Sequence, residues 1–183
     1  MPRHFAFLRA INVGGHNVTM EKLRGLFETL GLKEVETFIA SGNVIFKSQS
    51  RDVRGLRERI EDRLRKSLGY EVTTFIRTEA EIEAIAAYRP FKASQIESAG
   101  ALNVAFLAER LTPALRKTLM ALKTDIDDFH VRGREVYWLC KKKQSESTFS
   151  NALLERALKV RATFRGVNTV AKLAAKHIRS PSA

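Results

Sequence analysis

Apolar residues in the first half of the chain recur at two spacings, one typical of strands and the other of helices. Short, mostly apolar runs that favour β-strands occupy residues 5–11, 35–40, 43–47 and 72–77. Residues 19–30 and 51–68 instead carry apolar side chains at steps of three and four, which predicts amphipathic helices. Ser41-Gly42-Asn43 is expected to form the hairpin turn between the second and third strands. The predicted order of elements is βαββαβ.

Residues at the predicted helix ends support this order. Thr19 suits an N-cap ahead of the first helix, and Gly69 suits the left-handed residue that ends the second. Thr78-Glu79-Ala80-Glu81 matches a capping box, which predicts an additional short helix after the fourth strand. This helix must end before Pro90, because the residue before a proline avoids the helical conformation.

The second half of the chain repeats the order. Strands are predicted at residues 102–108, 129–132, 135–140 and 161–165, and helices at residues 112–122, 148–158 and 168–178. Only the order of elements indicates the repeat, since the halves share no local identity. We therefore predict an α+β fold of two duplicated ferredoxin-like βαββαβ lobes with antiparallel sheets, each followed by an extra helix. The lobes should span residues 1–89 and 101–183, with a linker at residues 90–100.

Several predicted strands are apolar at consecutive positions rather than at alternating ones. Residues 5–11, 104–107 and 136–140 show this pattern, whereas an antiparallel strand with one solvated face should alternate. Because helices cover only one face of such a sheet, we expect the other face to pack against the sibling sheet or a second subunit. Arg9 would then be buried within a strand, and a buried guanidinium needs an anionic partner from the protein or from a ligand.

Polar residues gather where this topology brings two loops together. Since the first and third strands are neighbours, the loop at residues 9–17 and the turn at residues 41–43 should meet at one edge of the first lobe. Glycines there let a ligand approach the backbone, and the following helix N-terminus offers N–H groups to an anion. The candidate ligand-binding residues are Arg9, Asn12, Gly14, Gly15, His16, Ser41 and Asn43. They predict a site for a small phosphate- or carboxylate-bearing ligand, and ordinary turn chemistry is the alternative interpretation.

The net charge of +12 introduces a second function class. Residues 141–183 hold ten lysines and arginines against two glutamates, and such a bias attracts polyanions. A basic nucleic-acid-associated protein, binding weakly and nonspecifically through backbone electrostatics, is therefore the alternative function. A protein that is basic without binding nucleic acid is the simpler interpretation. The predicted third strand, residues 43–47, lacks the aromatic pattern of RNA-recognition modules.

Other function classes lack their motifs. The chain has no GxxxxGKS, GxxxxGKT, GxGxxG or GxSxG segment, and its one cysteine and four histidines show no zinc spacing. No cofactor, metal or catalytic residue is predicted, so whether the protein is an enzyme stays open, as does its oligomeric state. No apolar run reaches the roughly 18–20 residues of a membrane span, and the N-terminus does not resemble a signal peptide. With Cys140 as the single cysteine, these features favour a cytoplasmic location without membrane partners.

Five segments carry a resemblance to a known family. They are RAINVGGHN at residues 9–17, SGNV at 41–44, PF at 90–91, SNALLER at 150–156 and NTV at 168–170. Together they resemble the bacterial family of domains of unknown function numbered 1697, over nearly the whole chain. The resemblance implies a duplicated ferredoxin-like fold and no established activity, cofactor or catalytic residue. Ala10 stands where the family usually has glycine, Thr148 where many members have lysine, and residues 164–169 lack the family's Asn-Trp pair.

Overall fold

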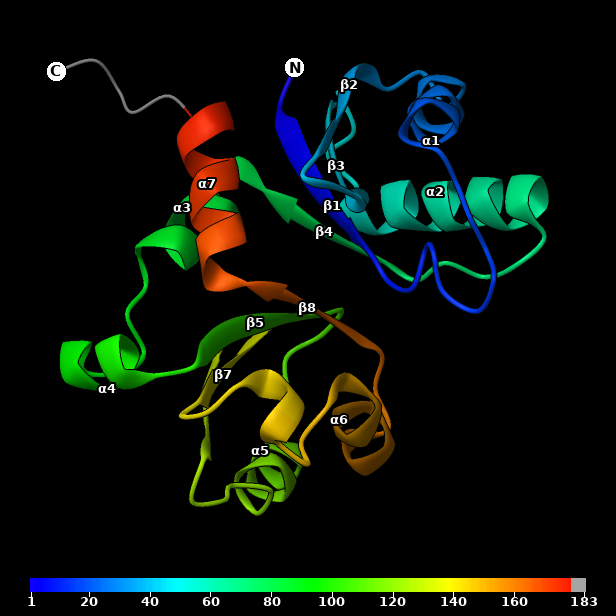
Figure 1. The fold of residues 1–183 in the computed structure, drawn as a ribbon. Helices are drawn as coiled ribbons and strands as arrows, with labels where there is room; N and C mark the ends of the chain where they lie inside the picture. Colours follow the sequence, from blue (N-terminus) through cyan, green and yellow to red (C-terminus); the bar gives the residue numbers. More distant parts are fainter. Residues whose placement is uncertain (179–183) are drawn as a thin grey trace, which may run out of the picture. The chain divides into compact units, whose positions relative to one another are not determined.

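Two four-stranded antiparallel sheets organise the computed structural model, which describes residues 1–178 apart from the side chain of Ser41 (Figure 1). The first sheet has the order β2-β3-β1-β4, with β1 (Arg3–Leu8), β2 (Lys33–Phe38), β3 (Ala40–Lys47) and β4 (Thr74–Thr78). The second has the order β6-β7-β5-β8, with β5 (Ala101–Leu107), β6 (Asp127–Arg132), β7 (Glu135–Cys140) and β8 (Ala162–Gly166). Both orders are those of a βαββαβ lobe, so the predicted fold class is confirmed.

Helices connect the strands as the predicted order requires. The lobe helices are α1 (Met20–Glu28), α2 (Val53–Leu68), α5 (Pro113–Met120) and α6 (Asn151–Leu158). The extra helices after each lobe are α3 (Glu79–Ala87) and α7 (Val167–His177), and α4 (Ala93–Ser98) and the 3-10 helix η1 (Gln144–Glu146) are shorter. Among these described helices, none is both long and apolar enough to cross a membrane.

Contacts along the chain divide it into two compact units. Unit 1 comprises residues 1–85 together with the chain from Leu173, and unit 2 comprises residues 86–172. The predicted lobes, by comparison, assign all of α7 to the second lobe, and the predicted linker contains α4. The C-terminal part of α7, from Leu173, therefore belongs to unit 1.

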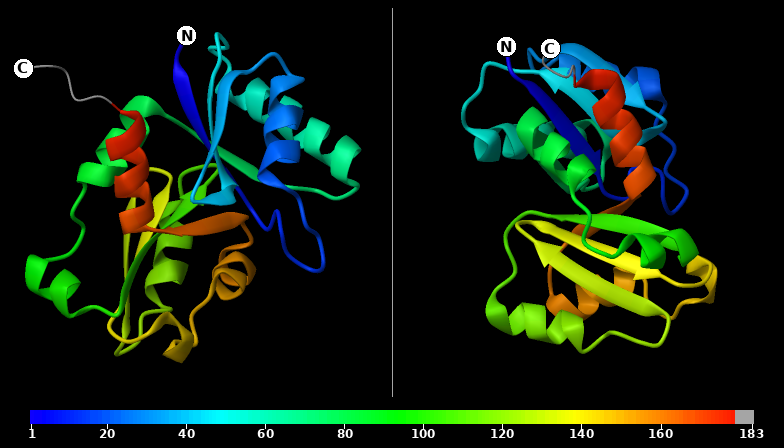
Figure 2. Two further views of the ribbon diagram at one scale, coloured as in Figure 1. Left: turned by 45° about the horizontal axis from the view of Figure 1, so that its top comes forward. Right: turned by 90° about the vertical axis from the view of Figure 1, so that its left-hand side faces the viewer.

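α1 and α2 cover one face of the first sheet (Figures 1 and 2). The hydroxyl of Thr19 accepts a hydrogen bond from the N–H of Lys22 and thereby caps α1, while Gly69 ends α2 in the left-handed conformation. Apolar side chains from both helices pack on the strands, among them Ala6, Leu8, Leu23, Phe27, Val44, Phe46, Leu56, Ile60, Leu64 and Ile76. Burying each of the larger ones contributes roughly 1.5–3 kcal/mol, so this layer is the main stabilising core of unit 1.

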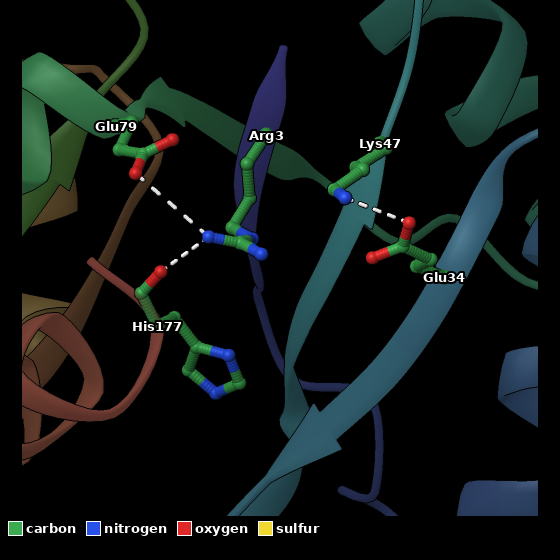
Figure 3. Close-up of polar contacts among 5 residues, drawn as sticks. All are labelled: Arg3, Glu34, Lys47, Glu79 and His177. Carbon is green, nitrogen blue, oxygen red and sulfur yellow. Dashed lines mark hydrogen bonds and ion pairs between the residues drawn. The ribbon is translucent and has the colours of Figure 1, made fainter. Parts of the chain in front are cut away.

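The opposite face of the first sheet is buried as well. It carries Phe5, Phe7, Ile45, Phe75 and Arg77. The imidazole of His177, at the end of α7, lies edge-on to the rings of Phe5 and Phe38, with centroid distances of 6.4 and 5.6 Å. Arg3 of β1 donates to the backbone carbonyl of His177 and lies 3.8 Å from a carboxylate oxygen of Glu79 in α3 (Figure 3). The end of α7 thus forms part of the cover over this face.

Unit 2 contains a buried carboxylate at the start of β6, one of the two edge strands of its sheet. Asp127 is 1% exposed and accepts hydrogen bonds of 2.8 Å from Trp138 Nε1, from Ser147 Oγ and from Thr124 Oγ. Three donors compensate for the lost hydration of this carboxylate. The bonds join β6 and β7 to the segment that follows η1, and they account for the buried position of the single tryptophan.

The predicted hairpin turn at Ser41-Gly42-Asn43 is wrong. β2 and β3 are joined at Ile39, which has a φ of 63°, and residues 41–43 belong to β3. The pairing of β3 with β2 moves from Val44 directly to Ala40, so residues 41–43 form a bulge opposite β2. A β-branched residue rarely adopts a positive φ, so the sequence favoured the glycine-containing segment as the turn.

The first strand is also shorter than predicted. β1 ends at Leu8, and Ala10 has a φ of 54°, which turns the chain away from the sheet. Arg9 is half-buried outside the strand, with its backbone N–H donating to the carbonyl of Thr73. The expectation of a fully buried guanidinium within β1 is therefore wrong.

Candidate functional site

The loop between β1 and α1 is the most exposed part of the candidate site. Every residue from Asn12 to Asn17 is exposed. Gly14 and Gly15 have φ values of 67° and 83°, and a Cβ placed on either glycine would meet no atom within 4 Å. Backbone groups of this glycine pair are therefore open to solvent, directly ahead of the N-terminus of α1.

Tyr70 contacts this loop at two residues. Its hydroxyl donates a hydrogen bond of 2.7 Å to the carbonyl of Ile11, and its ring stacks on the imidazole of His16 with a centroid distance of 3.7 Å. Burial raises the pKa of the Tyr70 phenol. Sequence reasoning missed Tyr70. The available signal was its position directly after Gly69, where the chain returns to the sheet end at which β1 stops.

The side chains of the two asparagines in the candidate set form hydrogen bonds with backbone groups of unit 1. The Oδ1 atom of Asn12 accepts a hydrogen bond of 2.7 Å from the N–H of Val18, which closes the loop. Asn43 is 2% exposed, and its Nδ2 donates to the carbonyl of Phe38 at 3.0 Å across the irregular β2–β3 connection. Both side chains thus fix the backbone around the site.

The topology brings the β1–α1 loop and residue 43 of β3 to one end of the first sheet. Asn43 pairs with Phe7 in the β1–β3 ladder, so β3 at residue 43 lies beside the end of β1 from which the loop departs. Arg9 and His16 belong to that loop, whereas the side chain of Ser41 lies outside the described parts of the chain. The β1–α1 loop and the backbone of β3 at residue 43 therefore lie at the same end of the sheet.

A shallow hollow of about 450 Å³ lies next to this edge, between α1 and β2. Met20, Glu21, Arg24, Val35, Glu36 and Thr37 line it. It includes the first residue of α1 but no residue of the candidate set, of which Asn12, Gly14, Gly15 and His16 are exposed instead. In residues 1–178, no group of three or more histidine, cysteine, aspartate or glutamate side chains is arranged to hold a metal ion.

Comparisons with known proteins agree with the fold and define the family. The model of a family of proteins of unknown function, DUF1697, matches residues 1–137, and the chain belongs to this family. The solved structure of the conserved bacterial protein SP0830 from Streptococcus pneumoniae is similar, with 25% sequence identity and a TM-score of 0.73. The match covers 95% of this chain and 97% of that protein. No curated protein matches the sequence.

Proposed function

We propose that the protein binds a small anionic ligand, bearing a phosphate or a carboxylate group, at the β1–α1 loop of unit 1. The observation that supports this most is the exposed Gly14-Gly15 pair, which has positive φ values and open space ahead of α1. N–H groups in such a turn can approach an anion closely, and the dipole of the following helix favours negative charge there.

The candidate residues would have different roles in this proposal. The glycine pair and His16 would contact the ligand, and Arg9 would supply positive charge at the edge of the loop. Asn12 and Asn43 would act indirectly, because their side chains hold Val18 and Phe38. The contacts of Tyr70 with Ile11 and His16 would keep the loop in one conformation, which reduces the entropy lost on binding.

Calorimetry and melting curves with inorganic phosphate, AMP and succinate test this proposal. His16→Gln should weaken binding of whichever anion the wild type binds by about tenfold, the effect expected for one missing hydrogen bond to a charged group. Lys33→Gln is the matched control, because Lys33 is exposed and begins β2 at the opposite end of the sheet. Undiminished binding by His16→Gln, or no response of the wild type to any of the three anions, would contradict the proposal.

Binding of a nucleic-acid backbone is the second candidate. Lys141, Lys142 and Lys143 favour it, because all three side chains are exposed directly after β7. For either activity we propose a cytoplasmic location, where the free, buried thiol of Cys140 would stay reduced.

A further inference from the structure

Three polar side chains form a cluster in unit 2 that is separate from the β1–α1 loop. Tyr88 lies between α3 and α4, and its hydroxyl oxygen is 2.6 Å from Nε2 of His130 on β6. The guanidinium carbon of Arg132, on the same strand, lies 4.1 Å from the centroid of the Tyr88 ring. His130 and Arg132 are alternate residues of β6 and so project from the same face of the sheet.

The pair of Tyr88 and His130 retains one hydrogen-bond donor beyond the bond that joins them. If Tyr88 donates to Nε2, the neutral imidazole carries its hydrogen on Nδ1. If Nε2 donates instead, the hydroxyl hydrogen of Tyr88 is directed elsewhere. Among the described residues, neither side chain has a second hydrogen-bond partner. The remaining donor is therefore available in both tautomers.

Arg132 adds a full positive charge at the same place. Its side chain is exposed, and among residues 1–178 it has no carboxylate within ion-pair distance, although Glu135 lies opposite it in the ladder. Asp128, two residues before His130, is paired with Lys123 at 2.8 Å. The contact of the guanidinium with the Tyr88 ring uses none of its N–H groups, which can then bind an oxyanion through two hydrogen bonds.

We propose that Tyr88, His130 and Arg132 form a binding site for a phosphate monoester. Arg132 would bind two phosphate oxygens, and the donor left on the pair of Tyr88 and His130 would bind a third. Alternate residues of a strand lie roughly 6.6 Å apart, a separation that a tetrahedral group with oxygens on several sides can bridge. A carboxylate has only two oxygens, and both would be engaged by the guanidinium, so the third donor favours phosphate.

Phenyl phosphate is the probe, with phenylacetate as the carboxylate of comparable size. Binding is measured by calorimetry and by the NMR signals of the histidine rings, with the His130 signal assigned through His130→Gln. Arg132→Gln should weaken phenyl phosphate binding by at least about tenfold. Tyr88→Phe, which keeps the ring beneath Arg132 but removes the hydroxyl, should weaken it severalfold. Arg116→Gln, an equal loss of charge at an exposed residue of α5, should leave the affinity unchanged.

Three outcomes would overturn the proposal. The first is an equal loss of affinity in Arg132→Gln and Arg116→Gln, which would indicate attraction to net charge alone. The second is binding of phenylacetate as tight as that of phenyl phosphate. The third is a response of the His16 signal with none at His130, which would reject this site while supporting the ligand site in unit 1.

Discussion

Single residues with unfavourable backbone conformations lie beside the candidate ligand site. Ala10 and Ile39 have φ values of 54° and 63°, a region in which a Cβ crowds the following carbonyl at a cost of roughly 1–2 kcal/mol. Ala10 begins the β1–α1 loop, and Ile39, which is 60% exposed, forms the β2–β3 connection at the same end of the sheet. Both connections at this end of the sheet therefore contain a residue in a costly backbone conformation.

Ala10→Gly should increase the free energy of unfolding by about 1 kcal/mol, because glycine adopts a positive φ without the Cβ clash. Ala84→Gly, at an exposed position within α3, is the matched control and should instead decrease this free energy by about 1 kcal/mol. Urea denaturation of the three proteins measures both changes. A destabilised Ala10→Gly would show that Ala10 does not adopt this conformation in solution.

At the scale of elements, the sequence predicted those parts whose signals are local. The caps at Thr19 and Gly69 and the capping box at Thr78 and Glu81 all form as expected, because each involves residues a few positions apart. The turn at Ile39 was missed because it opposes the preference of its own residue.

For the candidate site, the topology placed residues 9–17 and residue 43 at one end of the sheet, although residues 41–43 belong to β3 and not to a turn. The sequence could not show that Asn43 is buried against Phe38 rather than exposed to solvent. Nor could it show that Tyr70 stacks on His16, because that contact joins segments far apart in the chain. The tertiary contacts of these side chains therefore could not be predicted from the sequence.

The docked end of α7 should make the stability of unit 1 sensitive to acid. Burial lowers the pKa of His177, and Lys176 and Arg3 lower it further, against an opposing effect of Glu36. Burial also lowers the pKa of His4, while a backbone hydrogen bond with Pro2 and the charge of Glu81 oppose this effect. Each ring therefore takes up its proton at a lower pH when the protein is folded than when it is unfolded, where the pKa is about 6.5. Stability is then fully present above pH 6.5 and falls as the pH drops towards the folded-state pKa values.

We expect melting temperatures of the wild type to fall between pH 7 and pH 5. His177→Phe, which keeps a ring between Phe5 and Phe38 but cannot titrate, should show a smaller fall over this range. Lys33→Gln is the control that removes one exposed charge of unit 1 and keeps both the imidazole and the charges that act on it, so it should retain the pH dependence. Identical profiles for the wild type and His177→Phe would contradict this assignment.

At the scale of the whole molecule, several cations of the C-terminal segment are paired or buried within their own unit. Arg161 lies 3.8 Å from Glu155 in unit 2, and Lys176 lies 3.8 Å from Glu36 in unit 1. Burial lowers the pKa of Arg165 to about 10, and its guanidinium donates to Thr163 and to the carbonyl of Phe164. Arg179 lies outside the described residues. The consecutive lysines 141–143 remain as the concentrated, exposed positive group of this segment.

Replacing Lys141, Lys142 and Lys143 by serine should therefore lower the salt concentration at which the protein elutes from heparin. On duplex DNA, the slope of log affinity against log salt should become shallower by about 0.9 for each phosphate that these lysines no longer neutralise. The matched control is the triple change of Arg51, Arg54 and Lys66 to glutamine in and beside α2, which removes the same net charge from exposed positions. Equal shifts in both variants would mean that binding follows total charge and not the lysine cluster. Unchanged retention of the serine variant would mean that residues 141–143 are only a solvated loop, and the nucleic-acid alternative would have no structural support.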